Sequence, residues 1–450
     1  MVESSSGSTP VHSTESTTQP GLRKVINTAQ LWSIAVGMVI SGEYFGWNYG
    51  WAVAGTIGFL VATLLVTVMY LAFIFSYTEL TTSIPDAGGP FSYAKRAFGS
   101  TAAFIAGFAT LVDFLMSPPA IAAALGAYAN FLNPDLPVLA VAVGTYVVFI
   151  TINILGIKES ANFSMIVTAL AVVELLIYMA LVAPAYETKN VVAHNESFGM
   201  GGVFAALPFA IWFYLAIEGV AMVAEEVKNP KKTIPRGYLL GIGTLVALAL
   251  GTMLLTAGAG DWRLLSEIDY PLPETLAMVL GRTNPWSKIF ASLGLFGLIA
   301  SFHSLTLGYS RQVFALARSG YLPGFLAQVN RRFQTPHWAL IGGGIVGLIA
   351  LLSGTTGDII ILSALGAVIM YISSMISLFQ LRKKEPHLER PFMAPFYPYT
   401  PAVALVLSIV CLIAIIYYNP MLSLIFAGLL VVSLILFRLI GVRKNADEIS

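Results

Sequence analysis

The feature that most constrains this chain is a series of long apolar stretches separated by short polar connections. Each stretch is close to the roughly 20 residues that a helix needs to cross the hydrocarbon core of a bilayer. Backbone groups in lipid must be satisfied within the structure, and the stretches are too long for barrel strands, so each predicts a membrane helix. The twelve stretches cover residues 30–49, 53–80, 100–131, 136–155, 162–184, 202–223, 237–258, 287–310, 337–353, 358–380, 400–418 and 421–440.

The scarcity of charge points to the same class of protein. Charged residues make up 10% of the 450 residues and hydrophobic residues 57%, whereas soluble domains are roughly 25% charged. Such a surface needs lipid around it, which excludes soluble enzymes, nucleic-acid binders and secreted disulfide scaffolds. The sequence also lacks a phosphate-binding glycine loop, a Cys/His metal cluster and a His-Glu-x-x-His motif, so we expect no enzymatic activity, no metal and no cofactor.

The basic residues predict the orientation, because cytoplasmic loops carry an excess of Lys and Arg. With the N-terminus inside, all but four of the 24 basic residues fall on the cytoplasmic side. The four outer ones are Lys189, Arg263, Arg282 and Lys288. We therefore expect a multi-pass plasma-membrane protein, typical of a bacterial inner membrane, with both termini cytoplasmic. Residues 1–27 are predicted to form a disordered tail and 442–450 a short polar tail.

Two of the stretches look interrupted. The first contains four glycines around Ser-Gly-Glu, and the sixth contains Pro208 and the run Ala216-Ile-Glu-Gly219. Interrupted helices at matching places in two halves indicate a transporter built from inverted repeats. The predicted halves are 28–184 and 202–381, each with five helices, and 399–441 adds two more.

Several loop sequences carry a family resemblance. They are Glu79-Leu-Thr-Thr-Ser-Ile-Pro-Asp-Ala-Gly-Gly-Pro-Phe-Ser-Tyr-Ala-Lys-Arg-Ala-Phe-Gly99, Glu225-Glu-Val-Lys-Asn-Pro-Lys-Lys-Thr-Ile-Pro235, Ser310-Arg-Gln-Val-Phe-Ala-Leu-Ala-Arg-Ser-Gly-Tyr-Leu-Pro323, Arg382-Lys-Lys-Glu-Pro and Arg390-Pro-Phe. Together they closely resemble the cytoplasmic signatures of amino acid–polyamine–organocation (APC) permeases, in order, from about residue 28 to 400. The resemblance implies an all-α membrane protein of twelve helices, with a LeuT-like fold, a five-plus-five inverted repeat and broken helices 1 and 6.

A shorter match concerns the two broken helices. Met38-Val-Ile-Ser-Gly-Glu-Tyr-Phe-Gly-Trp-Asn-Tyr-Gly-Trp51 and Phe209-Ala-Ile-Trp-Phe-Tyr-Leu-Ala-Ile-Glu-Gly219 resemble the corresponding helices of ethanolamine permeases. The subgroup implies that the substrate is ethanolamine or a similar small primary amine.

The first break departs from the pattern of amino acid permeases, where Gly-Ser-Gly presents backbone amides to a carboxylate. Here Ile40 replaces the first glycine before Ser41 and Gly42, and Glu43 adds a negative charge. That change disfavours an anionic group and favours an organic cation. A carboxylate inside a membrane costs about 2.5–3.5 kcal/mol without a partner. One reading is that Glu43 pairs with the ammonium group of the substrate, with or without a proton. The other is that Glu43 is a neutral acid hydrogen-bonded to backbone groups that the break leaves free.

The second break supplies further candidates for the substrate site. By resemblance an aromatic residue here covers the substrate, and an ammonium gains about 0.5–2 kcal/mol over such a face. We expect Trp212 and Tyr44 to contribute most and Phe213 and Tyr214 less, with plain packing as the alternative reading. Ala216 replaces a family glycine, so Gly219 is expected to supply part of the flexibility.

Intramembrane acids and one histidine are candidates for binding and proton coupling. Asp113 is a second cation contact, a proton carrier or a polar brace, and Glu218 is a coupling or a structural carboxylate. Glu43, Glu218 and His303 are the candidate proton carriers, although a lone histidine is more often a hydrogen-bonded core residue. Glu174 is a weaker candidate. Residues 161–182 lack the lysine that replaces sodium in some family members, and the Ser and Thr of 301–306 leave Na⁺ coupling open.

The sequence therefore predicts a secondary or facilitative transporter that works by alternating access. Its expected partners are a small amine, a coupling H⁺ or Na⁺, and the lipid bilayer, with no nucleic acid. The loop residues Glu79, Asp86, Lys95, Arg96, Glu225, Glu226 and Lys228 are read as inner-gate and packing residues or as plain topology determinants. Two rivals remain: an amino acid permease or exchanger of the same family, and a non-transporting nutrient sensor.

Overall fold

The computed structural model describes residues 24–156, 161–195 and 199–447. Within these ranges the regular structure is helical, apart from one isolated bridge between Ile26 and Val227. The α-helices are α1 (Thr28–Val39), α2 (Ser41–Tyr44), α3 (Tyr49–Ser83), α4 (Pro90–Phe98), α5 (Ser100–Leu132), α6 (Val138–Ile154), α7 (Ala161–Val182), α8 (Thr188–Val192), α9 (Met200–Ala205), α10 (Leu207–Trp212), α11 (Pro230–Gly258), α12 (Pro271–Leu280), α13 (Pro285–Arg318), α14 (His337–Ser353), α15 (Thr356–Lys384), α16 (Tyr399–Tyr418) and α17 (Pro420–Asp447). The 3₁₀ segments are η1 (Ala183–Ala185), η2 (Ile217–Glu226), η3 (Trp262–Leu264) and η4 (Gly324–Ala327).

Helices long and apolar enough to cross a membrane dominate the part of the chain that the structure describes, and nine satisfy both conditions. They are α3, α5, α7, the run from α10 through η2, α11, α13, α15, α16 and α17. Three shorter apolar helices, α1, α6 and α14, stand where three further stretches were predicted. The all-α membrane class is confirmed, whereas twelve crossings and the LeuT-like details stay predictions.

The ends of the chain are more structured than the sequence suggested. The amides of Val25 and Ile26 both donate to the carbonyl of Glu226, at 2.8 and 3.0 Å. The last residues of the predicted N-terminal tail therefore join the end of η2, and α17 continues to Asp447 into the predicted C-terminal tail. Residues 1–23 and 448–450 lie outside the described residues.

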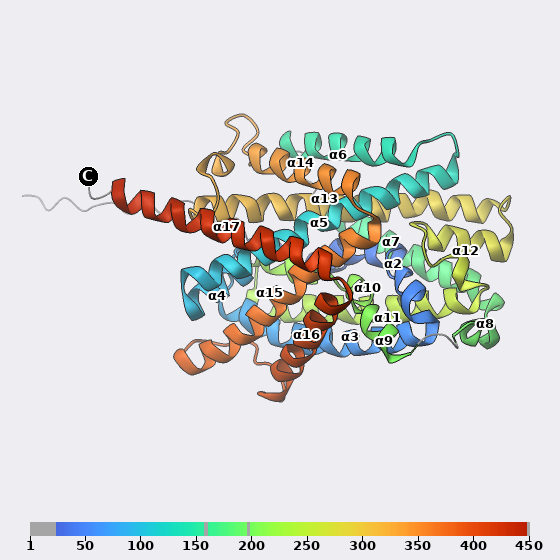
Figure 1. Ribbon diagram of the computed structural model, residues 1–450, viewed down its shortest axis with the longest axis horizontal. Coiled ribbons are helices and arrows are strands. Elements are labelled where there is room, and N and C mark those ends of the chain that lie inside the picture. Colours follow the sequence, from blue (N-terminus) through green and yellow to red (C-terminus); the bar gives the residue numbers. More distant parts are fainter. Residues whose placement is uncertain (1–23, 157–160, 196–198, 448–450) are drawn as a thin grey trace, which may run out of the picture.

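Helices from the two predicted repeats pack against each other rather than separately. α5 crosses the molecule obliquely and packs on α13, α15 and α6, while α1 packs on α11, α7 and α13 (Figure 1). Large aromatic side chains such as Trp47, Trp51 and Tyr70 are fully buried where these helices meet. The helical interruptions therefore lie inside a packed core.

The first interruption follows directly from its residues. Helix α1 ends at Val39, α2 has one turn, and Phe45 is extended with φ −163° and ψ 173°. Gly46 then adopts φ +91°, a conformation that glycine reaches without steric cost. The Asn48 side chain accepts from the Gly46 amide at 2.9 Å and donates to the carbonyl of Leu265 at 2.6 Å. The break is thus fixed to the connection between α11 and α12.

The second interruption falls at a residue other than the expected one. Ala216, rather than Gly219, adopts the left-handed conformation, with φ 78° and ψ 3°. Gly219 lies inside η2, where a Cβ atom would stand 2.7 Å from the Met38 sulfur and 3.0 Å from the Phe114 ring. The bend therefore lies at Ala216, and close packing accounts for glycine at 219.

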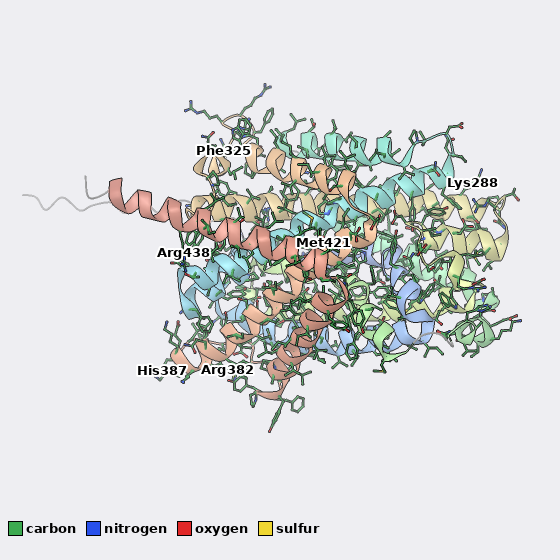
Figure 2. The ribbon with its side chains drawn as sticks, in the orientation of Figure 1. Lys288, Phe325, Arg382, His387, Met421 and Arg438 are labelled. Carbon is green, nitrogen blue, oxygen red and sulfur yellow. The ribbon has the colours of Figure 1, made fainter. Side chains whose placement is uncertain are left out.

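The long axis of the molecule separates residues that were predicted to lie on opposite membrane faces. Figure 2 shows Lys288 at one end and Arg382, His387 and Arg438 toward the other. This separation matches the predicted grouping of inner and outer basic residues. Which end is cytoplasmic remains a prediction.

Candidate functional site

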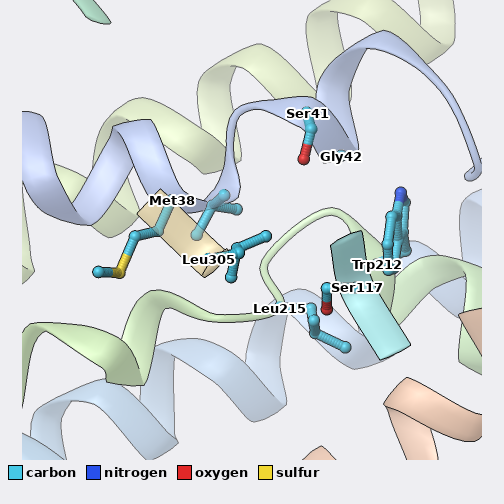
Figure 3. Close-up of a pocket in the computed structure, with 8 residues that line it drawn as sticks. Met38, Ser41, Gly42, Ser117, Trp212, Leu215 and Leu305 are labelled. Carbon is cyan, nitrogen blue, oxygen red and sulfur yellow. The ribbon is translucent and has the colours of Figure 1, made fainter. Parts of the chain in front are cut away.

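A small buried pocket lies where the two interrupted helices meet. It lies between α1, α2, α5, α13 and the end of α10, and the empty space there, open solvent included, is about 180 Å³ (Figure 3). Its lining residues are Met38, Val39, Ser41, Gly42, Ser117, Trp212, Leu215 and Leu305. All of these residues are buried.

The two breaks contact each other directly at this pocket. A Cβ atom on Gly42 would stand 2.4 Å from the backbone oxygen of Trp212, so only glycine allows the present approach. The Trp212 indole N–H donates to the backbone oxygen of Phe45 at 3.0 Å, and the two rings meet edge to face. Trp212 therefore links the second break to the first and forms one wall of the pocket, where the sequence placed it.

A pair of serine hydroxyl groups joins the first break to α13. The Oγ atoms of Ser41 and Ser301 lie 2.8 Å apart, and Ser301 donates to the backbone oxygen of Met38 at 2.8 Å. Ser301 and Leu305 are four residues apart on one face of α13, so both reach the pocket region. Among the described residues no group of three or more His, Cys, Asp or Glu side chains is arranged to hold a metal ion.

Glu43 and Tyr44 are buried beside the pocket but do not line it. Thr252 of α11 is the polar neighbour of the Glu43 carboxylate, whose two oxygens have no hydrogen-bond partner in the structure. The Tyr44 hydroxyl donates to Glu174 Oε2 at 2.8 Å. Glu174, the weaker candidate from the sequence, is thus part of the support of the first break.

The other two aromatic candidates face away from the pocket. The Phe213 ring stacks on Trp47 with centroids 5.5 Å apart. The Tyr214 hydroxyl lies 2.7 Å from the hydroxyl oxygen of Thr67 on α3. Both residues pack the second break against its neighbours, as the alternative reading from the sequence proposed.

Asp113 and Glu218 meet each other at the far side of the second break. Both side chains are buried, with at most 1% exposed, and the two carboxyl groups are close neighbours. Ser363 Oγ donates to Asp113 Oδ1 at 3.0 Å, and the Tyr371 hydroxyl donates to Glu218 Oε2 at 3.4 Å. The structure therefore brings together two acids that the sequence treated separately, next to the pocket rather than in its wall.

His303 lies on the opposite side of α13. Its Nδ1 is 3.1 Å from the side-chain nitrogen of Asn153 on α6, and its ring contacts Phe149. This is the environment of a hydrogen-bonded core histidine, and its role in proton coupling stays a prediction.

The loop motifs form a separate cluster of ion pairs. Arg382 pairs with Glu79, Arg390 also reaches Glu79 at 3.2 Å, and Arg96 pairs with Glu385. Glu225 Oε1 accepts from the Ala87 amide at 2.9 Å. The motif residues thus connect α3, α4, η2 and the end of α15, which agrees with a packing role.

Sequence reasoning missed several pocket residues. Ser117 follows Asp113 by one helical turn, and Leu305 lies within the Ser/Thr-rich run of α13. A helical projection from Asp113 would have found Ser117. Met38, Val39 and Leu215 are ordinary apolar residues, and only their position beside a break distinguishes them.

Comparisons with known proteins agree with this architecture. A sequence model of a family described as amino acid permease matches residues 26–439. An uncharacterized transporter of Rhizobium meliloti is 28% identical over 403 residues, which cover 86% of this chain and 85% of that protein.

Two relatives with more specific names come from Bacillus subtilis. A branched-chain amino acid permease is 25% identical over 414 residues, covering 86% of this chain and 87% of the relative. A methylthioribose transporter is 25% identical over 407 residues, covering 85% of this chain and 86% of the relative. These names describe different substrates, so the similarity extends over the fold and leaves the substrate open.

Proposed function

The chain belongs to the amino acid permease family and is a membrane transporter, and from that premise we propose that it carries ethanolamine or a similar small primary amine. Transport would proceed by alternating access, with the pocket between the two breaks opening to one side at a time. The observation that carries the proposal is the sign of the charges buried around the pocket.

Among the described residues, every Asp, Glu, Lys or Arg side chain that is buried is an acid. Glu43, Asp113, Glu174 and Glu218 are buried around the breaks, whereas no Lys or Arg side chain is buried in the described part of the chain. Intramembrane acids without basic partners are costly and are usually retained for function. A site surrounded in this way favours a cation over an anion.

The pocket itself suits a small substrate. The empty space between its walls, open solvent included, is about 180 Å³, which leaves room only for a small molecule. Trp212 offers an aromatic face, Ser41 and Ser117 offer hydroxyl groups, and the remaining lining is apolar. An ammonium group would be attracted by the aromatic face, and a hydroxyl group such as that of ethanolamine would match the serines.

The membrane potential alone would support accumulation of such a cation. A monovalent cation that enters down about 100 mV, negative inside, gains about 2.3 kcal/mol. This corresponds to roughly 50-fold accumulation, because each 1.4 kcal/mol is a factor of ten.

A second candidate is an amino acid permease or exchanger. The relative named as a branched-chain amino acid permease favours it, since it matches most of this chain. Ile40 and Glu43 speak against a carboxylate at the first break, because the carboxylate of Glu43 would repel it.

Uptake into proteoliposomes separates the two candidates. We expect labelled ethanolamine to accumulate under an inside-negative potential, with simple primary amines competing and zwitterionic amino acids failing to compete. Competition by branched-chain amino acids with no effect of amines would overturn the amine proposal.

A variant tests the partner of the ammonium. Glu43→Gln removes the charge next to Gly42 and keeps the shape, so we expect a raised KM for ethanolamine. Glu174→Gln is the matched comparison, because it neutralises a buried acid that touches Tyr44 instead of flanking the pocket. Uptake by Glu43→Gln that equals the unmodified protein would show that Glu43 is not the partner.

A further inference from the structure

We propose that Ser301, a residue outside the pocket lining, orients the Ser41 hydroxyl group so that the side chains of the pocket accept hydrogen bonds and donate none. The protein then selects its substrate by the N–H and O–H groups that the substrate brings. The inference rests on the proposed transport of a small amine and deepens it, because it names what a substrate needs besides a positive charge. Ser301 is a positioning residue, since it acts through Ser41.

The hydrogen atoms at Ser41 follow from a count of donors. A serine hydroxyl group has one hydrogen and two acceptor lone pairs. The hydrogen of Ser301 goes to the backbone oxygen of Met38 at 2.8 Å. The Oγ atoms of Ser41 and Ser301 lie 2.8 Å apart, so the hydrogen between them comes from Ser41. Because Ser41 lines the pocket, its oxygen meets a substrate as an acceptor.

The same count applies to Ser117, the second hydroxyl group of the lining. It donates to the Asp113 backbone oxygen at 3.0 Å and lies 3.0 Å from Ser363 Oγ. Ser363 in turn donates to the Asp113 backbone oxygen at 2.9 Å and to Asp113 Oδ1 at 3.0 Å. Whichever serine supplies the hydrogen between the two, the Ser117 hydrogen has an acceptor inside the protein. Ser117 therefore also offers lone pairs to a substrate.

Trp212 is the third polar side chain of the lining, and its indole N–H group is also occupied. It donates to the backbone oxygen of Phe45 at 3.0 Å, which leaves the ring face, an attractive surface for an ammonium group. Figure 3 shows Ser41 and Ser117 on separate elements near this ring. The other described lining side chains are those of Met, Val and Leu, which have no N–H or O–H group. The lining therefore has no free side-chain donor.

A lining of this kind distinguishes substrates that carry the same charge. A primary ammonium group has three N–H donors and can bond both serine oxygens, and the O–H group of ethanolamine is a further donor. A quaternary ammonium group keeps the charge but has no N–H group. A carboxylate or an ether oxygen loses its hydrogen bonds to water and finds no side-chain donor in return. Each lost hydrogen bond of a charged group weakens binding roughly ten- to hundredfold.

The first test compares two isomeric cations on the unmodified protein. Tetramethylammonium and tert-butylammonium have the same formula, the same charge and a similar globular shape, but only the second has N–H donors. Each competes with labelled ethanolamine for uptake into proteoliposomes. We expect tert-butylammonium to inhibit at a concentration roughly tenfold lower or more. Equal inhibition, or stronger inhibition by tetramethylammonium, overturns the proposal, because charge and ring contact alone would then suffice.

The second test changes the hydrogen at Ser41. Ser301→Ala removes the acceptor of the Ser41 hydrogen, which becomes available to a substrate. Linear propanolamine and methoxyethylamine are smaller isomers with the same ammonium group, but the first ends in a hydroxyl group and the second contains an ether oxygen that only accepts. In the unmodified protein propanolamine should inhibit at a concentration roughly tenfold lower. In Ser301→Ala the difference should fall below about threefold, because Ser41 now donates to the ether oxygen.

Two control variants separate this effect from a loss of stability. Ser301→Thr keeps the hydroxyl group and should restore the ratio of the unmodified protein. Ser310→Ala removes another buried hydroxyl group of α13, which donates to the Leu307 backbone oxygen at 2.8 Å, and should also keep the ratio. A ratio that Ser301→Ala leaves unchanged overturns the role of Ser301, because reduced folding lowers uptake without changing the ratio of two inhibitors.

The remaining outcomes are also decisive. If the globular cations are too large to inhibit, the two smaller isomers decide, and equal inhibition by them in the unmodified protein overturns the proposal. If Ser301→Ala carries no ethanolamine, the ratios of the unmodified protein still decide whether the lining only accepts. Absence of any ethanolamine flux in the unmodified protein refutes the transport proposal instead.

Discussion

The Arg382 guanidinium donates hydrogen bonds to both carboxylate oxygens of Glu79. The Nε and Nη2 atoms of the arginine donate at 2.8 and 2.6 Å, and the guanidinium lies 3.7 Å from the centre of the Tyr397 ring. The Ala394 amide donates to the same carboxylate at 2.7 Å. Only 1% of the Glu79 side chain and 15% of the Arg382 side chain are exposed, so α3 is linked to the end of α15 by an ion pair whose carboxylate is buried.

Removal of Arg382 should be strongly destabilising. Arg382→Ala leaves the Glu79 carboxylate buried with fewer partners, and breaking a buried pair costs about 3–5 kcal/mol. Because Arg390 and the Ala394 amide remain, we expect the lower end, about 3 kcal/mol, in the free energy of unfolding measured in detergent.

The matched control is the more exposed pair of Arg96 and Glu385. Their side chains are 42% and 28% exposed, and surface pairs are worth about 0.2–1 kcal/mol. Arg96→Ala should therefore cost less than about 1 kcal/mol. Equal losses in the two variants would contradict a special role for the buried pair.

Gly42 should be intolerant of any side chain. Gly42→Ala places a methyl group 2.4 Å from the Trp212 backbone oxygen, a contact that the backbone cannot relieve without separating the two breaks. We expect transport to fall at least tenfold, with the protein still folded by size-exclusion chromatography. Gly243→Ala on α11 is the control, since no atom stands within 4 Å of the added methyl group. Uptake that is unchanged in Gly42→Ala would mean that the breaks need not touch.

Because Ala216 has a left-handed backbone conformation, we expect Gly and Val at this position to have different effects on stability. Ala216→Gly relieves about 1–2 kcal/mol of backbone strain, loses about 0.8 kcal/mol of methyl burial and adds about 0.5–1 kcal/mol of chain entropy. The net change in the free energy of unfolding should stay within about 1 kcal/mol. Ala216→Val increases the backbone strain, because a β-branched residue is a conformational outlier at positive φ. We expect the Val variant to unfold at a lower temperature than both the unmodified protein and the Gly variant. A Val variant as stable as the unmodified protein would refute the bend at this residue.

The membrane helices were predictable because lipid imposes a simple rule on composition. The stretch 337–353 coincides with α14, and 400–418 differs from α16 by one residue. Helices with polar ends extend beyond the predicted stretches: α11 begins at Pro230 and α13 ends at Arg318. Pro230 at the first position of α11 and the backbone hydrogen bonds of Ser319 at the end of α13 extend these helices into polar sequence, which a count of apolar residues does not detect.

The candidate site was predictable only in part. The break residues Ser41, Gly42 and Trp212 line the pocket, and glycine and substitution patterns in the sequence mark such a break, while their contact with a substrate stays a prediction. The direction of a neighbouring side chain is set by tertiary packing instead. Glu43 is one residue from Gly42 but neighbours Thr252 of α11, and Asp113 and Glu218 are close neighbours although they lie 105 positions apart in the chain.

Asp269 gives a prediction of pH dependence. It lies in the connection between η3 and α12, accepts from the Tyr49 hydroxyl at 2.8 Å and from Thr356 at 2.9 Å, and so joins the start of α3 to the start of α15. Burial raises the pKa of this carboxyl group, although the hydrogen bonds from Tyr49 and Thr356 act in the opposite direction. The folded protein therefore holds the Asp269 proton more tightly than the unfolded chain does.

The sign of the effect follows from proton binding. An unfolded aspartate titrates near pH 4, so its contribution to stability is complete below that pH and is lost as the pH rises through the higher pKa of the folded state. Asp269→Asn retains an oxygen acceptor and no longer titrates. Thermal unfolding in detergent between about pH 4 and 7 should show a fall in stability with rising pH that is smaller in Asp269→Asn than in the unmodified protein. Asp261→Asn is the control, because it removes an exposed acid whose pKa is lowered by its hydrogen bond to Arg263. It should change the slope of stability against pH in the opposite direction. Equal slopes in all three proteins would rule out the buried Asp269 carboxyl group as the cause of the pH dependence.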